Sequence, residues 1–359
     1  RTSCSMTSVV NTASARKSHS PEWLFCIGLS LLLLAGCSRA PAPQQLSGQT
    51  MGTTWHVTVM PVAGGPPAAT LQADIQAVLD AVNSSMSTYR EDSEISRFNA
   101  LPAGDWLQVS TGFYRVLAAA IGIGRESGGA YDVTVGPLVN RWGFGPSPAP
   151  EELPGQAEIQ QFLAQVGQDQ LRLDGEGSRV RKLVPRQLDF SSIAKGFAVD
   201  QVAQQLEAAG IANYLVEVGG EMRLAGHSPR GDTWRIAIEQ PDSAGRAVAR
   251  AIRVTDAAVA TSGDYRNFFE VDGVRYSHTI DPRTGFPVRH RLVSVTVIHP
   301  RAMLADAWAT ALSVMGAAEG RALAQRLGLA VYFMDREGDA LRSSHSDAFA
   351  PYLEQGAGE

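Results

Sequence analysis

The sequence predicts an α+β fold in which mixed, mostly antiparallel sheets pack against helices. Short alternating apolar stretches are joined by glycine-containing turns, so hairpins outnumber strand–helix–strand units. Longer stretches with apolar residues at helical spacing lie between them. The chain contains no short-period repeat and no internal linker strong enough to separate two domains. We therefore expect one continuous folded unit.

The first predicted element is a half-buried strand at residues 53–60 (TTWHVTVM), where apolar and polar residues alternate. Apolar residues then recur every three or four positions from Leu71 to Val82, which predicts a helix. A second helix is expected at 112–127, ended by two glycines. This half closes with a helix at 157–166 and a hairpin at 171–183.

The second half begins with a helix at 197–210 that ends at a glycine. Within 267–281, the dipeptide Asp272-Gly273 lies between alternating runs and predicts a hairpin turn. The other expected elements are strands at 214–226, 233–241, 250–263 and 292–300, helices at 303–316 and 319–328, and a hairpin at 329–342.

The N-terminal residues 1–36 are typical of a bacterial export signal. A basic pair precedes the apolar stretch 23–36, which is too short to span a bilayer. Small residues precede Cys37 in LAGC, an order that resembles the lipobox of bacterial lipoproteins; an ordinary signal peptide with a chance cysteine is the alternative. We expect lipid attachment at Cys37, a tether at 37–50 that includes APAPQQ, and a periplasmic protein anchored by lipid to the inner or outer membrane.

Composition excludes several classes of protein. The net charge of −5 provides no basic footprint for nucleic acid. Cys37 is the only cysteine left once the signal is removed, which excludes an intramolecular disulfide and a cysteine-ligated zinc site. The motifs HExxH and GxSxG and the Walker loop are absent, so the common hydrolase and metalloprotease signatures find no support.

Residues 188–200 (LDFSSIAKGFAVD) place a carboxylate, two hydroxyls and an ammonium between apolar neighbours. The chain has 28 arginines but only three lysines, so Lys195 indicates a partly buried site that needs a compact ammonium. A surface lysine retained by chance is the alternative.

Two further segments carry candidate chemistry. Asp306 and Thr310 are four residues apart, on one face of a helix, and offer oxygen ligands for a cation such as Mg²⁺. The same spacing also fits a carboxylate that faces solvent. His278 precedes the turn sequence DPRTG, where it could act as a general base or hold structure.

Taken together, eight motifs occur in the order in which the ApbE family carries them, from about residue 51 to residue 328. The sequence resembles this family of FAD:protein FMN transferases, many of which are periplasmic lipoproteins. The resemblance implies a T-fold-related catalytic unit of two lobes over residues 51–350. The motifs are MGTTW, MSTYREDSEISRFN, GGAYDVTVGPL, LDFSSIAKG, VEVGGEMRLAG, ATSGDYRNFF, YSHTIDPRTGFPV and ADAWATAL.

The resemblance implies Mg²⁺-dependent transfer of FMN from FAD, the substrate, to a threonine or serine hydroxyl of an acceptor flavoprotein subunit, with release of AMP. It places His278 as the base that accepts the proton of that hydroxyl. The metal is expected on the Ser192 backbone carbonyl, the Asp306 carboxylate and the Thr310 hydroxyl. The expected FAD contacts are Met51, Tyr89, Ala130, Tyr131, Asp132, Asp189, Lys195 and Ile280.

Two other functions remain open at this point. A non-catalytic flavin-binding lipoprotein would keep the pocket but lose the metal ligands or the histidine, whereas this chain retains Asp306, Thr310 and His278. A hydrolase would use water in the same site and cut FAD into FMN and AMP. The sequence does not separate transfer from hydrolysis, because the acceptor is another protein.

Overall fold

A computed structural model describes residues 42–146, 152–241, 248–263, 268–338 and 340–354. These residues belong to one compact unit. The predicted signal peptide and Cys37 lie outside the described residues. No helix in the described part of the chain is both long enough and apolar enough to cross a bilayer.

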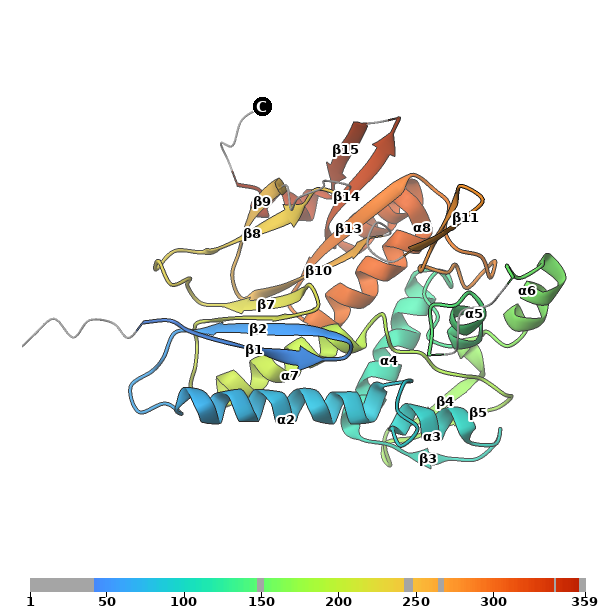
Figure 1. Ribbon diagram of the computed structural model, residues 1–359, viewed down its shortest axis with the longest axis horizontal. Coiled ribbons are helices and arrows are strands. Elements are labelled where there is room, and N and C mark those ends of the chain that lie inside the picture. Colours follow the sequence, from blue (N-terminus) through green and yellow to red (C-terminus); the bar gives the residue numbers. More distant parts are fainter. Residues whose placement is uncertain (1–41, 147–151, 242–247, 264–267, 339, 355–359) are drawn as a thin grey trace, which may run out of the picture. The chain divides into compact units, whose positions relative to one another are not determined.

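An eight-stranded sheet forms the centre of this unit (Figure 1). Every neighbouring pair of its strands is antiparallel, which confirms the predicted α+β class with antiparallel sheet. In spatial order the strands are β1 (Gln44–Thr50), β2 (Thr53–Val59), β6 (Tyr214–Val218), β7 (Glu221–Ala225), β10 (Ala257–Gly263), β13 (Leu292–His299), β14 (Ala330–Glu337) and β15 (Ala340–His345).

Helices cover one face of this sheet (Figure 1). Because strand side chains alternate between faces, Ala258 and Ala260 of β10 point into this helix-covered core while Val259 points away from it. The three helices packed on the sheet are α2 (Ala68–Met86), α7 (Ala194–Ala208) and α8 (Ala302–Leu327). The others are α3 (Glu94–Ala100), α4 (Thr111–Glu126), α5 (Gly136–Arg141) and α6 (Gln156–Leu163).

The opposite face of the sheet packs against a separate hairpin, β8 (Trp234–Glu239) and β9 (Val248–Val254), and against the short helix η2 (Asp347–Tyr352). This second core contains Val259 and the β8 residues Ile236 and Ile238. The remaining elements are β3 (Leu107–Gln108), β4 (Leu171–Asp174), β5 (Arg179–Lys182), η1 (Gln168–Gln170), β11 (Phe268–Val271) and β12 (Val274–Ser277).

The first strand corrects the predicted tether. Residues 44–50, expected within it, form β1 and pair along their whole length with β2. The turn between them is Met51-Gly52, and both residues have positive φ (49° and 72°), as a tight two-residue hairpin turn requires. The polar sequence QQLSGQT hid this strand, because pairing with β2 rather than an apolar pattern determines its conformation.

The last two predicted helices form one element. Residues 302–327 are a single helix, α8, interrupted at Gly316, whose φ of 78° is not helical. A glycine tolerates this conformation without strain, so the chain changes direction there and resumes the helix. The short helices α3 and α5 were not predicted, because six or seven residues carry too little periodicity.

Candidate active site

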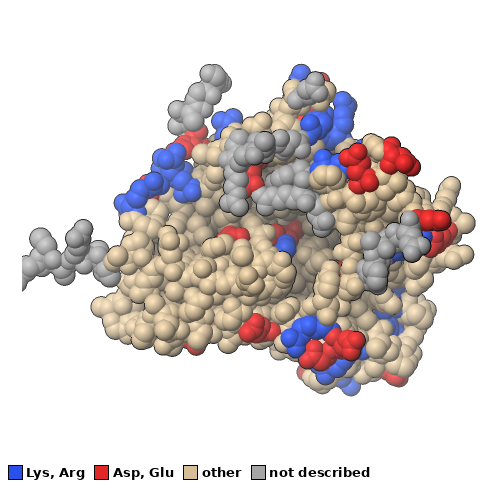
Figure 2. Space-filling view, viewed as in Figure 1, with Lys and Arg blue, Asp and Glu red and all other residues tan. Residues whose placement is uncertain are grey.

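One cavity of about 1350 Å³ collects the residues that the sequence analysis singled out. Figure 2 shows the hollow near the middle of this face, with acidic and basic side chains inside it. The β1–β2 turn, the segments that follow α2 and α4, and the first turn of α7 line it, together with Asp306, Thr310 and Val314 of α8. All twelve predicted FAD, metal and base residues are among its lining: Met51, Tyr89, Ala130, Tyr131, Asp132, Asp189, Ser192, Lys195, His278, Ile280, Asp306 and Thr310.

The start of α7 leaves a backbone carbonyl without a hydrogen-bond donor. In a regular helical turn the N–H of Gly196 would donate to the carbonyl of Ser192. Here that N–H donates instead to Asp306 Oδ2, at 2.9 Å. No described group donates to the Ser192 carbonyl. The predicted metal ligand on the Ser192 backbone is therefore available.

Gly196 also permits the close crossing of α7 and α8. A Cβ atom at this position would lie 2.3 Å from the Ala302 carbonyl oxygen and 2.8 Å from Asp306 Cβ. Only a glycine allows the two backbones to approach so closely. The crossing brings Asp306 of α8 to the beginning of α7.

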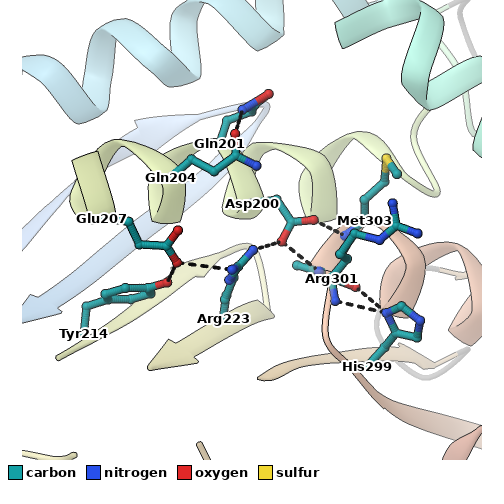
Figure 3. A network of polar contacts seen from close by, with 10 residues as sticks. Asp200, Gln201, Gln204, Glu207, Tyr214, Arg223, His299, Arg301 and Met303 are labelled. Carbon is teal, nitrogen blue, oxygen red and sulfur yellow. Dashed lines mark hydrogen bonds and ion pairs between the residues drawn. The ribbon is translucent and has the colours of Figure 1, made fainter. Parts of the chain in front are cut away.

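A buried carboxylate on α7 holds the first turn of α8 (Figure 3). Asp200 accepts hydrogen bonds from the backbone N–H groups of Ala302 and Met303, at 2.9 and 3.0 Å, and from Arg223 Nη1, at 2.9 Å. It caps a helix that has no cap from its own N-cap residue Arg301. Asp306 lies one turn further along, so Asp200 fixes its position.

Sequence reasoning missed Asp200. The sequence feature that could have revealed it is a carboxylate on the apolar side of the predicted helix at 197–210, because an unpaired charge there would be costly.

Lys195 forms an ion pair with Glu221 at the start of β7, with 2.8 Å between Nζ and Oε1. The lysine side chain is 29% exposed and the glutamate 5%, which confirms the predicted partly buried ammonium. Burial lowers the pKa of Lys195, but the charges of Asp306 and Glu221 outweigh it, and the net pKa shift is upward. Lys195 therefore stays protonated.

Glu221 was missed as a site residue, although the motif VEVGGEMRLAG contains it. Burial raises its pKa to about 7, against the lowering effect of Lys195. Its Oε2 atom is buried and has no partner among the described residues. Gly219 lies in the turn between β6 and β7, just before Glu221. A side chain is not tolerated there, because a Cβ would lie 2.9 Å from Thr53 and 3.2 Å from Lys195 Cδ.

Helix α8 provides the remaining predicted metal ligands from its second and third turns. Asp306 is 5% exposed and faces the cavity, so the alternative of a solvent-facing carboxylate is excluded. Burial raises its pKa, while Lys195 and the Gly196 N–H oppose that shift. Its Oδ1 has no hydrogen-bond donor among the described residues, and Thr310 lies one turn further in the same wall.

A magnesium ion fits this set of donors. The Ser192 carbonyl, Asp306 Oδ1 and the Thr310 hydroxyl are hard oxygen ligands, which Mg²⁺ prefers. No group of three or more His, Cys, Asp or Glu side chains in the described part of the chain is arranged to hold a metal. A site with one carboxylate leaves coordination positions for water and for a phosphate.

The segment after α4 supplies another wall. The Tyr131 hydroxyl lies 2.9 Å from Ser192 Oγ, and burial raises the pKa of this phenol. The Asp132 carboxylate accepts from the N–H and hydroxyl of Thr134 and from the N–H of Gln168, at 2.6 to 3.0 Å. Burial also raises the pKa of Asp132, although these hydrogen bonds oppose the shift. Asp132 therefore organises its own loop as well as bordering the cavity.

His278 follows β12 directly and is half-buried at the cavity. Its ring meets Phe144 edge-on, with 6.3 Å between ring centroids, and Phe144 continues into stacked aromatic rings that include Phe269 and Tyr276. The hairpin that carries the histidine is thus anchored by aromatic packing. Tyr89, by contrast, is 71% exposed at the rim.

The sequence profile of the ApbE family matches residues 51–333 of this chain. The chain belongs to the ApbE family. Among curated ApbE relatives, it is 46% identical to the FAD:protein FMN transferase of Vibrio cholerae over 92% of this chain and 99% of the relative. It is 38% identical to the enzyme of the same description from Escherichia coli, over 90% and 95% of the two chains.

Solved ApbE structures share the fold. The Vibrio cholerae flavin transferase ApbE superposes with a TM-score of 0.81 at 44% identity and covers 87% of this chain and 100% of its own. The apo form of the Pseudomonas stutzeri flavinyl transferase ApbE gives the same TM-score at 42% identity, covering 88% and 98%. The fold class predicted from the sequence is therefore confirmed at the level of the family.

Proposed function

We propose that this protein transfers the FMN half of FAD to a threonine or serine hydroxyl of an acceptor protein, with Mg²⁺, and releases AMP. The relatives are named for flavin transfer, and this chain matches them over nearly their whole length. The observation that carries the finer proposal is the convergence in one cavity of Lys195, His278 and the three oxygen donors around Asp306.

The reaction breaks the pyrophosphate of FAD and forms a phosphoester. The acceptor oxygen attacks the phosphorus on the riboflavin side, the bond to the bridging oxygen breaks, and AMP leaves with that oxygen. Negative charge spreads over the phosphate oxygens, so catalysis depends on positioning and on charge neutralisation. Lys195, held protonated between two carboxylates, supplies a fixed positive charge. A bound Mg²⁺ would neutralise further charge on the phosphates.

His278 completes the proposal as the base. A threonine hydroxyl is a weak nucleophile at neutral pH, so a group that accepts its proton accelerates attack by about 10²–10⁴-fold. The aromatic packing of Phe144 and its neighbours fixes the imidazole against the cavity.

We also propose that the folded unit acts in the periplasm, held to the membrane by a lipid on Cys37. The short tether would then run from Cys37 to Gln44, where β1 begins. The protein that accepts FMN would then be an exported flavoprotein subunit, such as a subunit of a membrane redox complex.

Mass spectrometry of an acceptor tests the function. The unflavinylated acceptor of the Vibrio cholerae relative, incubated with this protein, FAD and Mg²⁺, should gain the mass of FMN on one threonine or serine while AMP appears in equal amount. FMN released free in solution, with no change in the acceptor, would identify a hydrolase.

The metal ligands are tested by Asp306→Asn, which keeps the shape of the side chain and removes its charge. Turnover should fall by at least about 10²-fold, the scale on which one charge-stabilising group contributes. Calorimetry should show weaker Mg²⁺ binding. Asp80→Asn on the exposed side of α2 is the matched control and should leave both unchanged. Equal turnover of the two variants at limiting Mg²⁺ would refute the metal site.

A further inference from the structure

The cavity has a second wall that none of the predicted FAD or metal residues uses. It lies on the sheet face opposite the helices, where Met222 of β7 pairs with Val259 of β10 beneath strand β8. The volume of about 1350 Å³ exceeds the range of roughly 300–1000 Å³ that is typical of small-molecule pockets. The cavity therefore has room beside a dinucleotide.

Strand β8 borders this wall with its backbone. Four consecutive residues, Ile236, Ala237, Ile238 and Glu239, line the cavity. Side chains alternate across a strand, so several residues in a row line a cavity where the edge of the strand faces it. Within the described ranges β8 pairs with β9 alone, and its other edge is unpaired.

The hydrogen bonds of β9 show which backbone groups point to that edge. The carbonyl of Ala251 accepts from the N–H of Glu354, at 3.3 Å, so the polar groups of Ala251 point away from β8. Ala237 is its cross-strand partner. In an antiparallel pair of strands, the backbone N–H and C=O groups of a non-hydrogen-bonded residue pair point away from the partner strand. The N–H and C=O of Ala237 therefore point toward the cavity, and no described group bonds to them.

We propose that the free edge of β8 binds the acceptor polypeptide as an added antiparallel or parallel strand, with Ala237 as the central pairing residue. This inference rests on the proposed function, which requires a polypeptide hydroxyl and FAD in one cavity. Pairing with the main chain holds an extended segment whatever its sequence, and pockets for alternate side chains add specificity. Met222 and Val259 form such an apolar floor below the edge.

The shape of the cavity indicates which form of the acceptor can bring its hydroxyl to the site. A folded surface is too broad to enter this cavity, whereas one extended strand brings a single hydroxyl deep into it. Ala237 is small and exposed, so its side chain leaves a partner strand unobstructed. Ile238 and His278 line the same cavity.

Ala237→Pro tests the pairing, because proline removes the N–H and its ring blocks a neighbouring strand. We expect the KM for the unflavinylated acceptor of the Vibrio cholerae relative to rise about tenfold, the scale of one or two lost backbone hydrogen bonds. FAD affinity, measured by flavin fluorescence, should change less than about twofold, since the predicted FAD contacts lie elsewhere. Ala63→Pro is the matched control, because Ala63 occupies the second position of the exposed turn 62–65, where proline is favoured, and it should retain the native KM. An unchanged KM in the Ala237→Pro variant overturns the inference.

Hydrogen exchange on the native protein gives an answer that does not depend on the folding of a variant. The FAD-loaded protein is mixed with the same acceptor, in which the flavin-accepting residue is changed to alanine. Exchange at residues 236–238 should slow only in this mixture. Normal transfer with no slowing there refutes strand addition, and slowing without acceptor at high protein concentration assigns the edge to a second copy of this chain. Failure of the native protein to modify any acceptor would refute the proposed function instead.

Discussion

Lysine and arginine are not interchangeable in this chain, and the two lysines in the described residues show why. Lys182 is buried, and its Nζ donates to the carbonyls of Phe98, Asn99 and Arg186 at 2.9 to 3.0 Å. Lys195 Nζ pairs with Glu221, and its Cδ lies 3.2 Å from the position that a Cβ on Gly219 would take. Lys182 directs its three donors at three carbonyls and Lys195 directs one at Glu221, and a planar guanidinium does not match either arrangement.

Lys195→Arg should therefore weaken FAD binding although the charge is retained. Lys195 Cδ passes close to Gly219, 3.2 Å from the position of a Cβ there, so the wider guanidinium would have to shift and would pair with Glu221 in a poorer geometry. We expect FAD affinity to fall about tenfold, as for a buried charge pair of poor geometry. Titration by flavin fluorescence measures the loss, and thermal unfolding serves as the control for an intact fold. Native affinity and native rate together would make this lysine incidental.

His278→Ala should separate binding from chemistry. If the imidazole accepts the acceptor's proton, its loss acts on the transition state and spares the ground state. FMN transfer should fall by about two to four orders of magnitude while FAD affinity stays near the native value. Rapid-quench kinetics with mass spectrometry would measure the transfer. A loss of affinity in proportion to the rate would instead show a binding role.

At the scale of elements, the crossing of α7 and α8 determines the site. Neither helix alone predicts that Asp306 meets the first turn of α7; Gly196 and Asp200 bring this about through contacts across more than a hundred residues. Periodicity predicted both helices, because each carries a regular apolar stripe. It could not predict their crossing, which depends on side-chain volume at one glycine.

Gly196→Ala should destabilise the protein even though alanine is the better helix former. The helix propensity gain is about 1 kcal/mol, whereas overpacking in a close crossing costs about 1–3 kcal/mol. With a backbone oxygen 2.3 Å from the new Cβ, we expect the clash to prevail and the two helices to separate. Thermal unfolding and Mg²⁺ affinity should both decrease.

Gly122→Ala in α4 is the matched control, because nothing described lies within 4 Å of its Cβ position. It should stabilise the protein by about 0.5–1 kcal/mol. Equal stabilisation by both substitutions would show that the crossing tolerates a methyl group.

At the scale of the whole molecule, the proposed lipid anchor at Cys37 would act independently of the folded unit. The acyl chains of a lipidated cysteine supply the binding energy, and several buried methylene groups each contribute about 0.8 kcal/mol. Cys37→Ala should therefore shift the protein from the membrane fraction to the soluble periplasmic fraction, with FMN transfer retained in solution. Cell fractionation with immunoblotting checks this expectation. A variant that remains in the membrane fraction would exclude Cys37 as the anchor.

The sequence by itself determined the class of fold, most of its helices and strands, and twelve of the residues that line the cavity. Apolar periodicity is a local property, and the family motifs preserve the identities of the site residues. The sequence did not reveal β1, whose conformation depends on pairing with β2.

Only the tertiary structure decided that Asp306 is buried rather than solvent-facing, that Glu221 pairs with Lys195, and that the edge of β8 faces the cavity. Each of these depends on contacts between segments far apart in the chain. Such contacts are set by close packing and by the hydrogen bonds left over from secondary structure, which no local pattern records.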